Sequence, residues 1–266
     1  MPVFGIESAG KSSLVARLRY DDRDPKAATI GFEPCTIRFR HHSTLTTSCW
    51  PRSTRYRLTL YDVGGGPKIR GIWKSYIAEA HALIYVVRGD SSADKLRESV
   101  NELKAIMEQS REITAKGKPI LIFVNCIIGK PTVSAELRIL LESEGLGPLS
   151  DKNTPAETLD TISIREVSCR GVFRPEKHKN QVAPLEPEKS RGIDPRVFAS
   201  LNELIDLVER YRGPLEQRIA KDVKRQHELS AQELLAKRKR IEEYQKLKSA
   251  EMTEQTEQTE KKAEGP

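Results

Sequence analysis

The chain has 266 residues, enough for one domain with extensions or for two small domains. Four widely spaced cysteines show no metal-binding or Cys-x-x-Cys pattern, and no apolar run has membrane-spanning length, which argues against a disulfide scaffold and a transmembrane protein. The net charge of +7 would suit nucleic acid or anionic lipid, but the basic residues are scattered. We therefore interpret them as solvated surface and expect a cytoplasmic protein with no nucleic-acid partner.

Apolar patterns predict alternating strands and helices in the first part of the chain. Residues 81–87 and 119–124 are nearly continuous apolar runs, typical of central parallel strands buried on both faces. Between them, residues 93–111 have apolar side chains at helical spacing. This alternation indicates an α/β fold, a doubly wound and mostly parallel sheet flanked by helices. The remaining predicted elements are a helix at 13–20, strands at 36–39 and 56–61, a helix at 134–144 and a strand at 162–167.

The domain that contains these elements is expected to cover residues 1–212. Residues 41–55 are rich in Ser, Thr and Arg and predict an insertion between two strands. Residues 170–195 are basic and rich in proline, which predicts a mobile loop. An amphipathic helix at 198–211 would then pack on the sheet.

A different composition begins after this domain. Pro214 suits the first turn of a helix, and residues 213–252 are dense in charge. We predict a long charged helix there, solvated rather than a strict coiled coil, because apolar residues are not sustained at heptad positions. Residues 253–266 repeat Thr, Glu and Gln and predict a low-complexity, disordered end.

The most specific motif is Gly5–Ser12, which matches the phosphate-binding pattern Gly-x-x-x-x-Gly-Lys-Ser/Thr. The glycines let the backbone wrap around a polyphosphate with its N–H groups pointing inward. The Lys11 ammonium would reach the outer phosphates, and the Ser12 hydroxyl can ligate Mg²⁺. Only residues 1–4 precede the motif, and Pro2 cannot donate to a sheet ladder. We therefore expect either a missing natural start or a weakened first strand.

A second phosphate element follows the strand that ends at Tyr61. Asp62 at a strand end can hold Mg²⁺ through water, and Gly65, three residues later, offers a backbone N–H to a γ-phosphate. Thr29 lies between the two motifs in the chain and could supply the second hydroxyl for Mg²⁺. Together the three segments predict a Mg²⁺–triphosphate site.

These motifs, with residues 68–76 and the apolar run 82–87, resemble the Arf family of small GTPases, a branch of the P-loop NTPases. The resemblance extends from residue 5 to about residue 140. Gly64–Gly66, residues 68–73 and the charged helix are most similar to the ciliary Arf-like subfamily linked to Joubert syndrome. This resemblance implies a GTP/GDP- and Mg²⁺-dependent switch, cytoplasmic or ciliary, that acts as an exchange factor for another Arf-like GTPase. It also suggests a membrane anchor, which we expect in a missing start.

The family's residue roles can be carried over to matching positions. Lys11 would neutralise the β- and γ-phosphates, Ser12 and Thr29 would ligate Mg²⁺, and Asp62 would hold the ion through a water. The N–H group of Gly65 would sense the γ-phosphate. The nucleotide-binding residues that the resemblance implies are Gly5, Ile6, Glu7, Ser8, Ala9, Gly10, Lys11, Ser12, Ser13, Thr29, Gly65, Asn125, Ser168 and Cys169.

Four aromatic residues on either side of the second motif suggest a partner surface. Phe32, Tyr61 and Tyr76 resemble the family's exposed effector triad, and Trp73 lies beside it in the sequence. Ordinary core packing of these side chains is an equally good interpretation.

Gly66 departs from the pattern of most Arf proteins, which carry there the glutamine that orients the attacking water. Glycine has no side chain for this task, and positioning is most of phosphoryl-transfer catalysis. We therefore expect slow hydrolysis or none, and a binder and switch rather than an efficient enzyme.

The base-recognition motif departs further. The family pattern Asn-Lys-x-Asp is replaced by Asn125-Cys126-Ile127-Ile128. Ile128 cannot accept the two guanine hydrogen bonds that the aspartate accepts, at a cost of about 1–3 kcal/mol for each unpaired donor. Two accounts are open: a degenerate binder that holds nucleotide weakly or without base specificity, or a sequence truncated at Met1 and mis-spliced between Val124 and Lys130. The alternative function is a pseudo-GTPase scaffold that binds partners through the switch surface and the C-terminal helix. Ser168 and Cys169 occupy the family's last motif, which offers backbone N–H groups to guanine.

Overall fold

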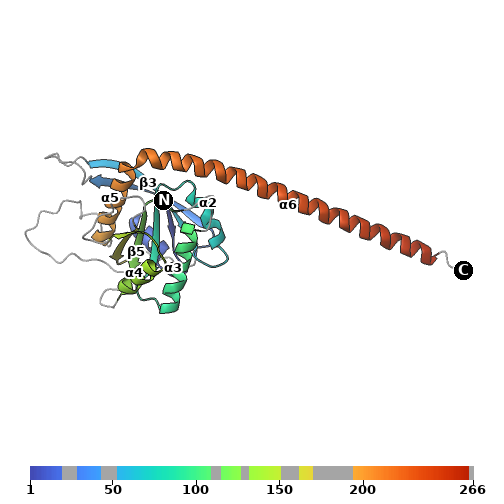
Figure 1. The fold of residues 1–266 in the computed structure, drawn as a ribbon, viewed down its shortest axis with the longest axis horizontal. Helices are drawn as coiled ribbons and strands as arrows, with labels where there is room; N and C mark the ends of the chain where they lie inside the picture. Colours follow the sequence, from blue (N-terminus) through green and yellow to red (C-terminus); the bar gives the residue numbers. More distant parts are fainter. Residues whose placement is uncertain are drawn as a thin grey trace, which may run out of the picture. The chain divides into compact units, whose positions relative to one another are not determined.

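The computed structural model describes residues 1–19, 29–42, 53–108, 115–126, 132–150, 162–169 and 194–263. A seven-stranded sheet of order β2-β3-β1-β4-β5-β7-β6 organises the domain (Figure 1). All strand pairs are parallel except β2–β3, which confirms the predicted doubly wound α/β fold. The strands are β1 Pro2–Phe4, β2 Phe32–His42, β3 Ser53–Val63, β4 Leu83–Arg88, β5 Ile120–Asn125, β6 Leu149–Ser150 and β7 Ile162–Val167. The helices are α1 Lys11–Leu18, a 3-10 turn η1 Arg70–Ile72, α2 Trp73–Ile77, α3 Ala93–Glu108, α4 Ser134–Ser143, α5 Pro195–Arg210 and α6 Arg212–Ala263.

Both faces of the central strands are buried, as the apolar runs predict. Along β4, Ile84 and Val86 join the core formed with α1 and α5, while Tyr85 points to the other face and donates to the carbonyl of Ser99 in α3 at 2.7 Å. Alternate residues of one strand thus serve two cores. This explains why these strands lack polar alternation in the sequence.

The short first strand occupies the centre of the sheet. Pro2 is in register with Tyr61 of β3, and Val3 is in register with Ile84 of β4. The N-terminal ammonium of Met1 also donates to the carbonyl of Thr59 at 2.8 Å. Three residues therefore form a strand with partners on both sides, and its carboxyl end leads directly into Gly5.

The β2–β3 hairpin is longer than the sequence predicts. Each strand has eleven residues, so 41–42 and 53–55, expected in an insertion, are strand instead. The physical reason is that the inward alternation continues to His41, whose Nε2 lies 3.0 Å from Oδ1 of Asp206 in α5, with both side chains buried. Residues 43–52 lie outside the described part of the chain.

The C-terminal part contains α5 and α6. Asp194 accepts from the backbone N–H of Arg196 at 3.0 Å and caps α5, with Pro195 as its first residue. The mobile loop predicted at 170–195 falls mostly on residues 170–193, outside the described chain. α6 continues to Ala263, past the helix end expected at 252, in keeping with the helix propensity of Glu, Gln and Lys. Among the described residues, no helix is long and apolar enough to cross a membrane.

The chain divides into two compact units, Met1–Asp222 and Val223–Pro266, and α6 begins in the first. Its first turns are part of the domain, because Leu215 is fully buried and Asp222 is nearly so. In the second unit, the described apolar side chains Leu234, Leu235, Ile241 and Tyr244 are exposed.

A buried lysine fixes the start of α6. The Nζ of Lys118 donates to the carbonyls of Ile77 at 2.5 Å and Ala78 at 3.1 Å, and lies 3.1 Å from Oδ2 of Asp222. Arg218 also donates to Asp222, at 2.9 Å. Burial lowers the pKa of Lys118, and Asp222 opposes this change. The ammonium thus joins the end of α2 to the first turns of α6.

We expect Lys118→Ala to lower the free energy of unfolding by about 3 kcal/mol, because it removes one partner of a buried ion pair and leaves two carbonyls without their donor. Urea denaturation followed by circular dichroism measures this change. The exposed neighbour Lys116 provides a matched control, and Lys116→Ala should cost less than about 0.5 kcal/mol. Equal losses in the two variants would contradict the role given to Lys118.

Candidate functional site

The Gly5–Ser12 loop connects β1 to α1 and has the backbone shape of a phosphate cradle. Gly5 and Gly10 have φ angles of 141° and 101°, which side-chain-bearing residues rarely adopt. A Cβ at Gly5 would lie 2.3 Å from the carbonyl oxygen of Val86, and one at Gly10 would lie 2.1 Å from the side chain of Asn125. Glu7 and Ser8 are exposed at the tip of the loop, while Ile6 and Ala9 are buried beneath it. Close packing therefore explains both glycines.

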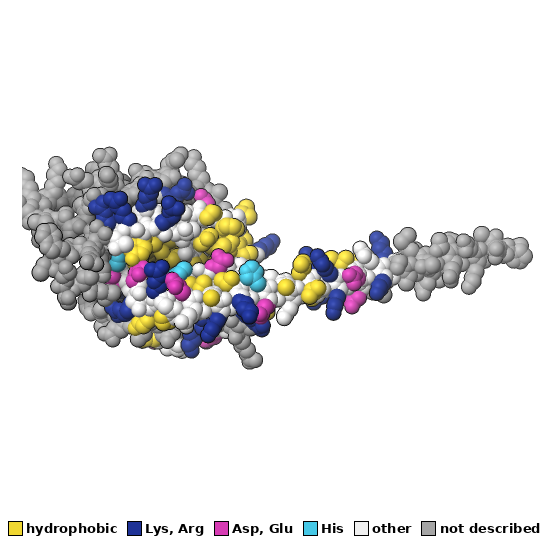
Figure 2. All heavy atoms as spheres, turned by 90° about the horizontal axis from the view of Figure 1, so that it is seen from above, with side chains coloured by type: hydrophobic (Ala, Val, Ile, Leu, Met, Phe, Trp, Pro, Cys, Tyr) yellow, Lys and Arg dark blue, Asp and Glu magenta, His cyan; other side chains and the backbone are white. Residues whose placement is uncertain are grey.

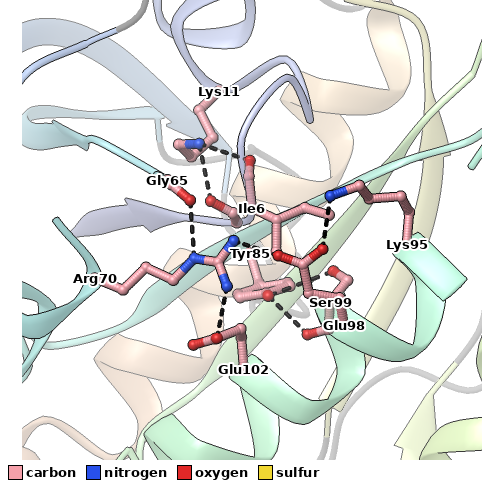
Figure 3. A network of polar contacts seen from close by, with 10 residues as sticks. Ile6, Lys11, Gly65, Arg70, Tyr85, Lys95, Glu98, Ser99 and Glu102 are labelled. Atoms are coloured by element: carbon pink, nitrogen blue, oxygen red, sulfur yellow. Dashed lines mark hydrogen bonds and ion pairs between the residues drawn. The ribbon is translucent and has the colours of Figure 1, made fainter. Parts of the chain in front are cut away.

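Lys11 is buried below this loop. Its Nζ donates to the carbonyls of Gly5 at 2.9 Å and Ile6 at 3.0 Å (Figure 3). Burial lowers the pKa of Lys11 to about 8, and the charge of Asp62 offsets part of this shift. The site therefore holds a desolvated cation whose charge an anion would stabilise.

Three oxygen-bearing side chains meet beside Lys11, as the sequence predicts. Oγ of Ser12 and Oγ1 of Thr29 are 3.0 Å apart, and Thr29 donates to Oδ2 of Asp62 at 3.4 Å. Burial raises the pKa of Asp62, although Ser12 and Lys11 act in the opposite direction. Oδ1 of Asp62 is buried and has no hydrogen-bond partner among the described residues. Two hydroxyls and a carboxylate with an unpaired oxygen suit the oxygen chemistry that Mg²⁺ requires.

The three glycines after β3 are held by their carbonyl groups. Trp73 donates from Nε1 to the carbonyl of Gly64 at 2.9 Å, and Arg70 donates from Nε to that of Gly65 at 2.9 Å. The carbonyl of Gly66 accepts from the N–H of Ile69 at 2.9 Å. A Cβ at Gly65 would lie 2.4 Å from the Gly5 carbonyl oxygen and 2.5 Å from Nζ of Lys11. The Gly64–Gly66 loop therefore contacts the phosphate cradle directly.

Arg70 anchors this loop to α3. Its two terminal nitrogens lie 2.5 Å from Oε1 of Glu98 and 2.6 Å from Oε1 of Glu102. Figure 3 shows the guanidinium between the Gly65 carbonyl and the two carboxylates. The guanidinium has five fixed donors, so one side chain can position a loop carbonyl and two acidic groups at once.

At the other end of the cradle, Asn125 joins two loops. Its Nδ2 donates to the carbonyl of Ala9 at 3.1 Å, and its Oδ1 accepts from the N–H of Cys169 at 3.0 Å. The N–H of Ser168 donates to Oδ2 of Asp194 at 2.9 Å. The two backbone donors expected to face guanine therefore bond to protein acceptors. Positions 127–130, which include Ile128, lie outside the described residues.

Two cysteines lie in this region. Burial raises the pKa of Cys126 to about 11 and that of Cys169 to about 12. Both thiols are therefore protonated near neutral pH and behave as small apolar groups. Cys126 stands where the family pattern places a lysine stem.

The aromatic residues separate into a surface cluster and a core residue. Phe32, Tyr61 and Tyr76 have ring centroids between 5.1 and 6.4 Å apart. Phe32 is 49% exposed, and both tyrosines are half-buried. Trp73 is buried and stacks on Phe4 with centroids 4.9 Å apart. Phe32, Tyr61 and Tyr76 form one partly exposed surface (the aromatic cluster), whereas Trp73 is a core residue.

Sequence reasoning missed several residues that shape the site. Arg70 lies in a segment used only for the family resemblance, and its partners Glu98 and Glu102 read as ordinary solvated helix positions. Asp194, by contrast, stands before Pro195, and an acidic residue followed by proline is a recognisable helix start. That signal would have placed Asp194 at the cap of α5, although not at the N–H of Ser168.

The phosphate cradle at the end of the central strand, with hydroxyl and carboxylate groups supplied by the adjacent loop and strand, defines a P-loop nucleotide-binding domain. Residues 1–154 match the sequence model of the ADP-ribosylation factor family, so the chain belongs to the Arf family of small GTPases. This family binds guanine nucleotides, usually with Mg²⁺.

The chain is similar to several characterised proteins over a part of their length. The E3 ubiquitin-protein ligase arc-1 of Caenorhabditis elegans is 33% identical over 126 residues, which are 46% of this chain and 20% of that protein. ADP-ribosylation factor-like protein 13B of Chlamydomonas reinhardtii is 32% identical over 124 residues, 46% of this chain and 20% of the relative. The Caenorhabditis elegans protein of the same name is 35% identical over 123 residues, which are 46% of this chain and 28% of that relative. The matched part thus spans less than a third of these relatives.

The packing of the glycine loop predicts a sharp difference between two adjacent positions. Gly65→Ala should weaken nucleoside-triphosphate binding on the order of tenfold or more, because the added methyl group collides with backbone atoms of the cradle. Gly66→Ala should change affinity by less than about twofold, because a Cβ there meets only Ile69 Cδ1 at 4.0 Å. Fluorescent-nucleotide titration compares the two, and similar affinities would contradict the contact.

The lowered pKa of Lys11 predicts that nucleotide binding takes up a proton. At pH near 8, about half of the Lys11 side chains are uncharged, and bound phosphates should recharge them, so about half a proton enters per nucleotide. Well below that pH the uptake from this group should vanish, and above it affinity should fall. Calorimetry in buffers of different ionisation enthalpy measures the uptake. Lys11→Met should abolish it, and equal uptake in both proteins would exclude Lys11 as its source.

Proposed function

We propose that the chain is a GTP- and Mg²⁺-responsive molecular switch with weak intrinsic hydrolysis, which acts by binding a partner protein. The observation that carries this proposal is the arrangement of Lys11, Ser12, Thr29 and Asp62 around one cradle. In it, a desolvated ammonium and an unpaired carboxylate oxygen lie beside two hydroxyls. The whole set of nucleotide contacts given above from the family resemblance is part of the proposal.

The bonded loops indicate how nucleotide state could be sensed. Bound Mg²⁺ would supply positive charge that neutralises the outer phosphates. Ser12 and Thr29 would hold the ion directly, with Asp62 behind a water. Thr29 and Gly65 come from different loops, and each contacts a residue of the cradle or of α1. A γ-phosphate could therefore order both loops together.

Gly66 supports a switch more than a hydrolase. No side chain at this position can orient water, and transition-state positioning is the main task in phosphoryl transfer. Binding and release of nucleotide would then set the state of the loops, with the rate of cleavage playing a minor part.

The aromatic cluster supports partner binding. Phe32 and Tyr61 lie on β2 and β3 next to Thr29 and Asp62, and Tyr76 lies on α2 behind the glycine loop. Aromatic side chains are enriched at protein interfaces. Following the family resemblance of the sequence motifs, we propose that the partner is another Arf-like GTPase, that the chain acts as its exchange factor, and that this occurs in ciliary trafficking.

A second candidate is a scaffold that has lost nucleotide binding. It is favoured by one observation: the backbone donors of Ser168 and Cys169 are bonded to Asp194 and Asn125. Guanine would have to compete with these acceptors. In this version the aromatic cluster binds its partner without nucleotide.

Nucleotide titration distinguishes the two candidates. We expect the full chain to bind fluorescent GTP at micromolar concentration in Mg²⁺, more weakly in EDTA, and more weakly still for Lys11→Ala. ATP should compete less effectively than GTP. This result requires that the cradle both holds phosphates and selects guanine.

Two outcomes would overturn the switch. Equal competition by GTP and ATP would show that the site does not select guanine. Nucleotide binding unaffected by Lys11→Ala would show that the cradle is not the nucleotide site. No measurable binding in wild-type protein of verified fold would favour the scaffold.

A further inference from the structure

Four exposed arginines occupy neighbouring positions on the outward face of the β2–β3 hairpin. The register pairs Arg38 with Arg57 and Arg40 with Arg55, and all four side chains are exposed. Residues opposite each other share a face, as do residues two apart on a strand. The four therefore form one group (the arginine block), with Cα atoms about 5 Å apart across the strands and about 7 Å apart along them.

The buried face of the hairpin determines that the four arginines point outward. On the inward face, Ile37 and Phe39 of β2 and Leu58 of β3 are buried, and His41 pairs with Asp206 of α5. A slip of one residue would turn these side chains outward and bury the arginines. The block is thus fixed by the core rather than by contacts of its own.

Three arginines of the block lack a compensating acidic partner within the described part of the chain. Like charges directly opposite one another destabilise paired strands. Among the described residues, Arg38, Arg55 and Arg57 have no ion-pair partner. The next pair on the same face is Thr36 and Thr59, so no acidic side chain follows the block in that direction. An external anionic surface would remove the repulsion.

We propose that the arginine block docks on the anionic headgroups of a phospholipid membrane. A headgroup layer offers many phosphates and leaves guanidinium groups hydrated, whereas a protein interface would desolvate all four and require a carboxylate for each. Single-stranded nucleic acid favours aromatic side chains among the cations, whereas the residues next to the block on this face are Thr36 and Thr59, and the first aromatic side chain, Tyr61, lies beyond them. Charge complementarity therefore favours the membrane.

The block is distinct from the nucleotide site. Asp62 and the glycine loop lie at the carboxyl end of β3, whereas Arg55 and Arg57 lie near its beginning. Thr36, Thr59, Pro34 and Tyr61 separate the block from Phe32 along the same face. Figure 2 shows Lys and Arg side chains gathered at the end of the domain on which the hairpin lies in Figure 1. A membrane at the block would leave the aromatic cluster available to a partner.

Vesicle cosedimentation of the full chain tests this proposal. Wild-type protein should bind phosphatidylcholine vesicles that contain phosphatidylserine, should bind pure phosphatidylcholine vesicles poorly, and should dissociate as salt rises. Arg38→Gln with Arg57→Gln should weaken binding about 30-fold, and glutamine at all four positions on the order of 10²- to 10³-fold. Nucleotide binding should stay at the wild-type level in these variants, which separates the membrane site from the proposed switch.

A matched control removes two exposed basic side chains elsewhere, Arg97→Gln with Lys116→Gln. This variant has the same net charge as the first and should retain most vesicle binding. Equal loss in the two double variants would show a net-charge effect and overturn the block as a site. So would equal binding of wild-type protein to both kinds of vesicle. Loss of binding to duplex DNA or to polyglutamate, with vesicle binding unchanged, would reassign the block to nucleic acid or to an acidic protein.

Discussion

The buried ammonium group of Lys11 is the charge around which the loops of this domain are arranged. Its Nζ donates to two carbonyls of its own loop and lies close to Gly65, and the charge of Asp62 raises its pKa. A cation with so little water needs oxygen atoms close to it, and the Gly5 and Ile6 carbonyls of the cradle supply them, with the charge of Asp62 near the end of β3. Glycine is required at position 65 because a Cβ there would lie 2.4 Å from the Gly5 carbonyl oxygen and 2.5 Å from Nζ of Lys11, whereas Gly5 is required by its close approach to the carbonyl of Val86. The electrostatics of one side chain thus explain the backbone of two segments.

The proximity of Lys11, Ser12 and Asp62 could be predicted from the sequence, because motif spacing and strand ends fix it locally. Ser12 follows Lys11 at the start of α1, and Asp62 ends a strand adjacent to β1, so they must meet. The base end was less predictable. Asn125 bonds to Cys169, and Ser168 bonds to Asp194, through contacts that join segments 44 and 26 residues apart. No local pattern encodes such pairings, and the same holds for Arg70 with Glu98 and Glu102.

The β2–β3 hairpin shows that strand length and register, rather than composition, determine which side chains share a face. Read as sequence, Arg38, Arg40, Arg55 and Arg57 are part of a scattered basic charge that we interpreted as solvated surface. Only the pairing shows that they stand in two opposed pairs on one face. The underestimated strand length had the same origin, since His41 looks like a loop residue until its buried partner Asp206 is known.

Lys118 couples the position of α2 to that of α6, in addition to stabilising the domain. The residue before Ile77 is Tyr76, which forms part of the aromatic cluster, and the carbonyl of Ile77 shares the ammonium with the carboxylate of Asp222. The end of α2 cannot shift unless Lys118 moves with it or loses an acceptor in a dry environment. A displacement of Tyr76 would therefore be felt, through the Lys118 ammonium, in the first turns of α6.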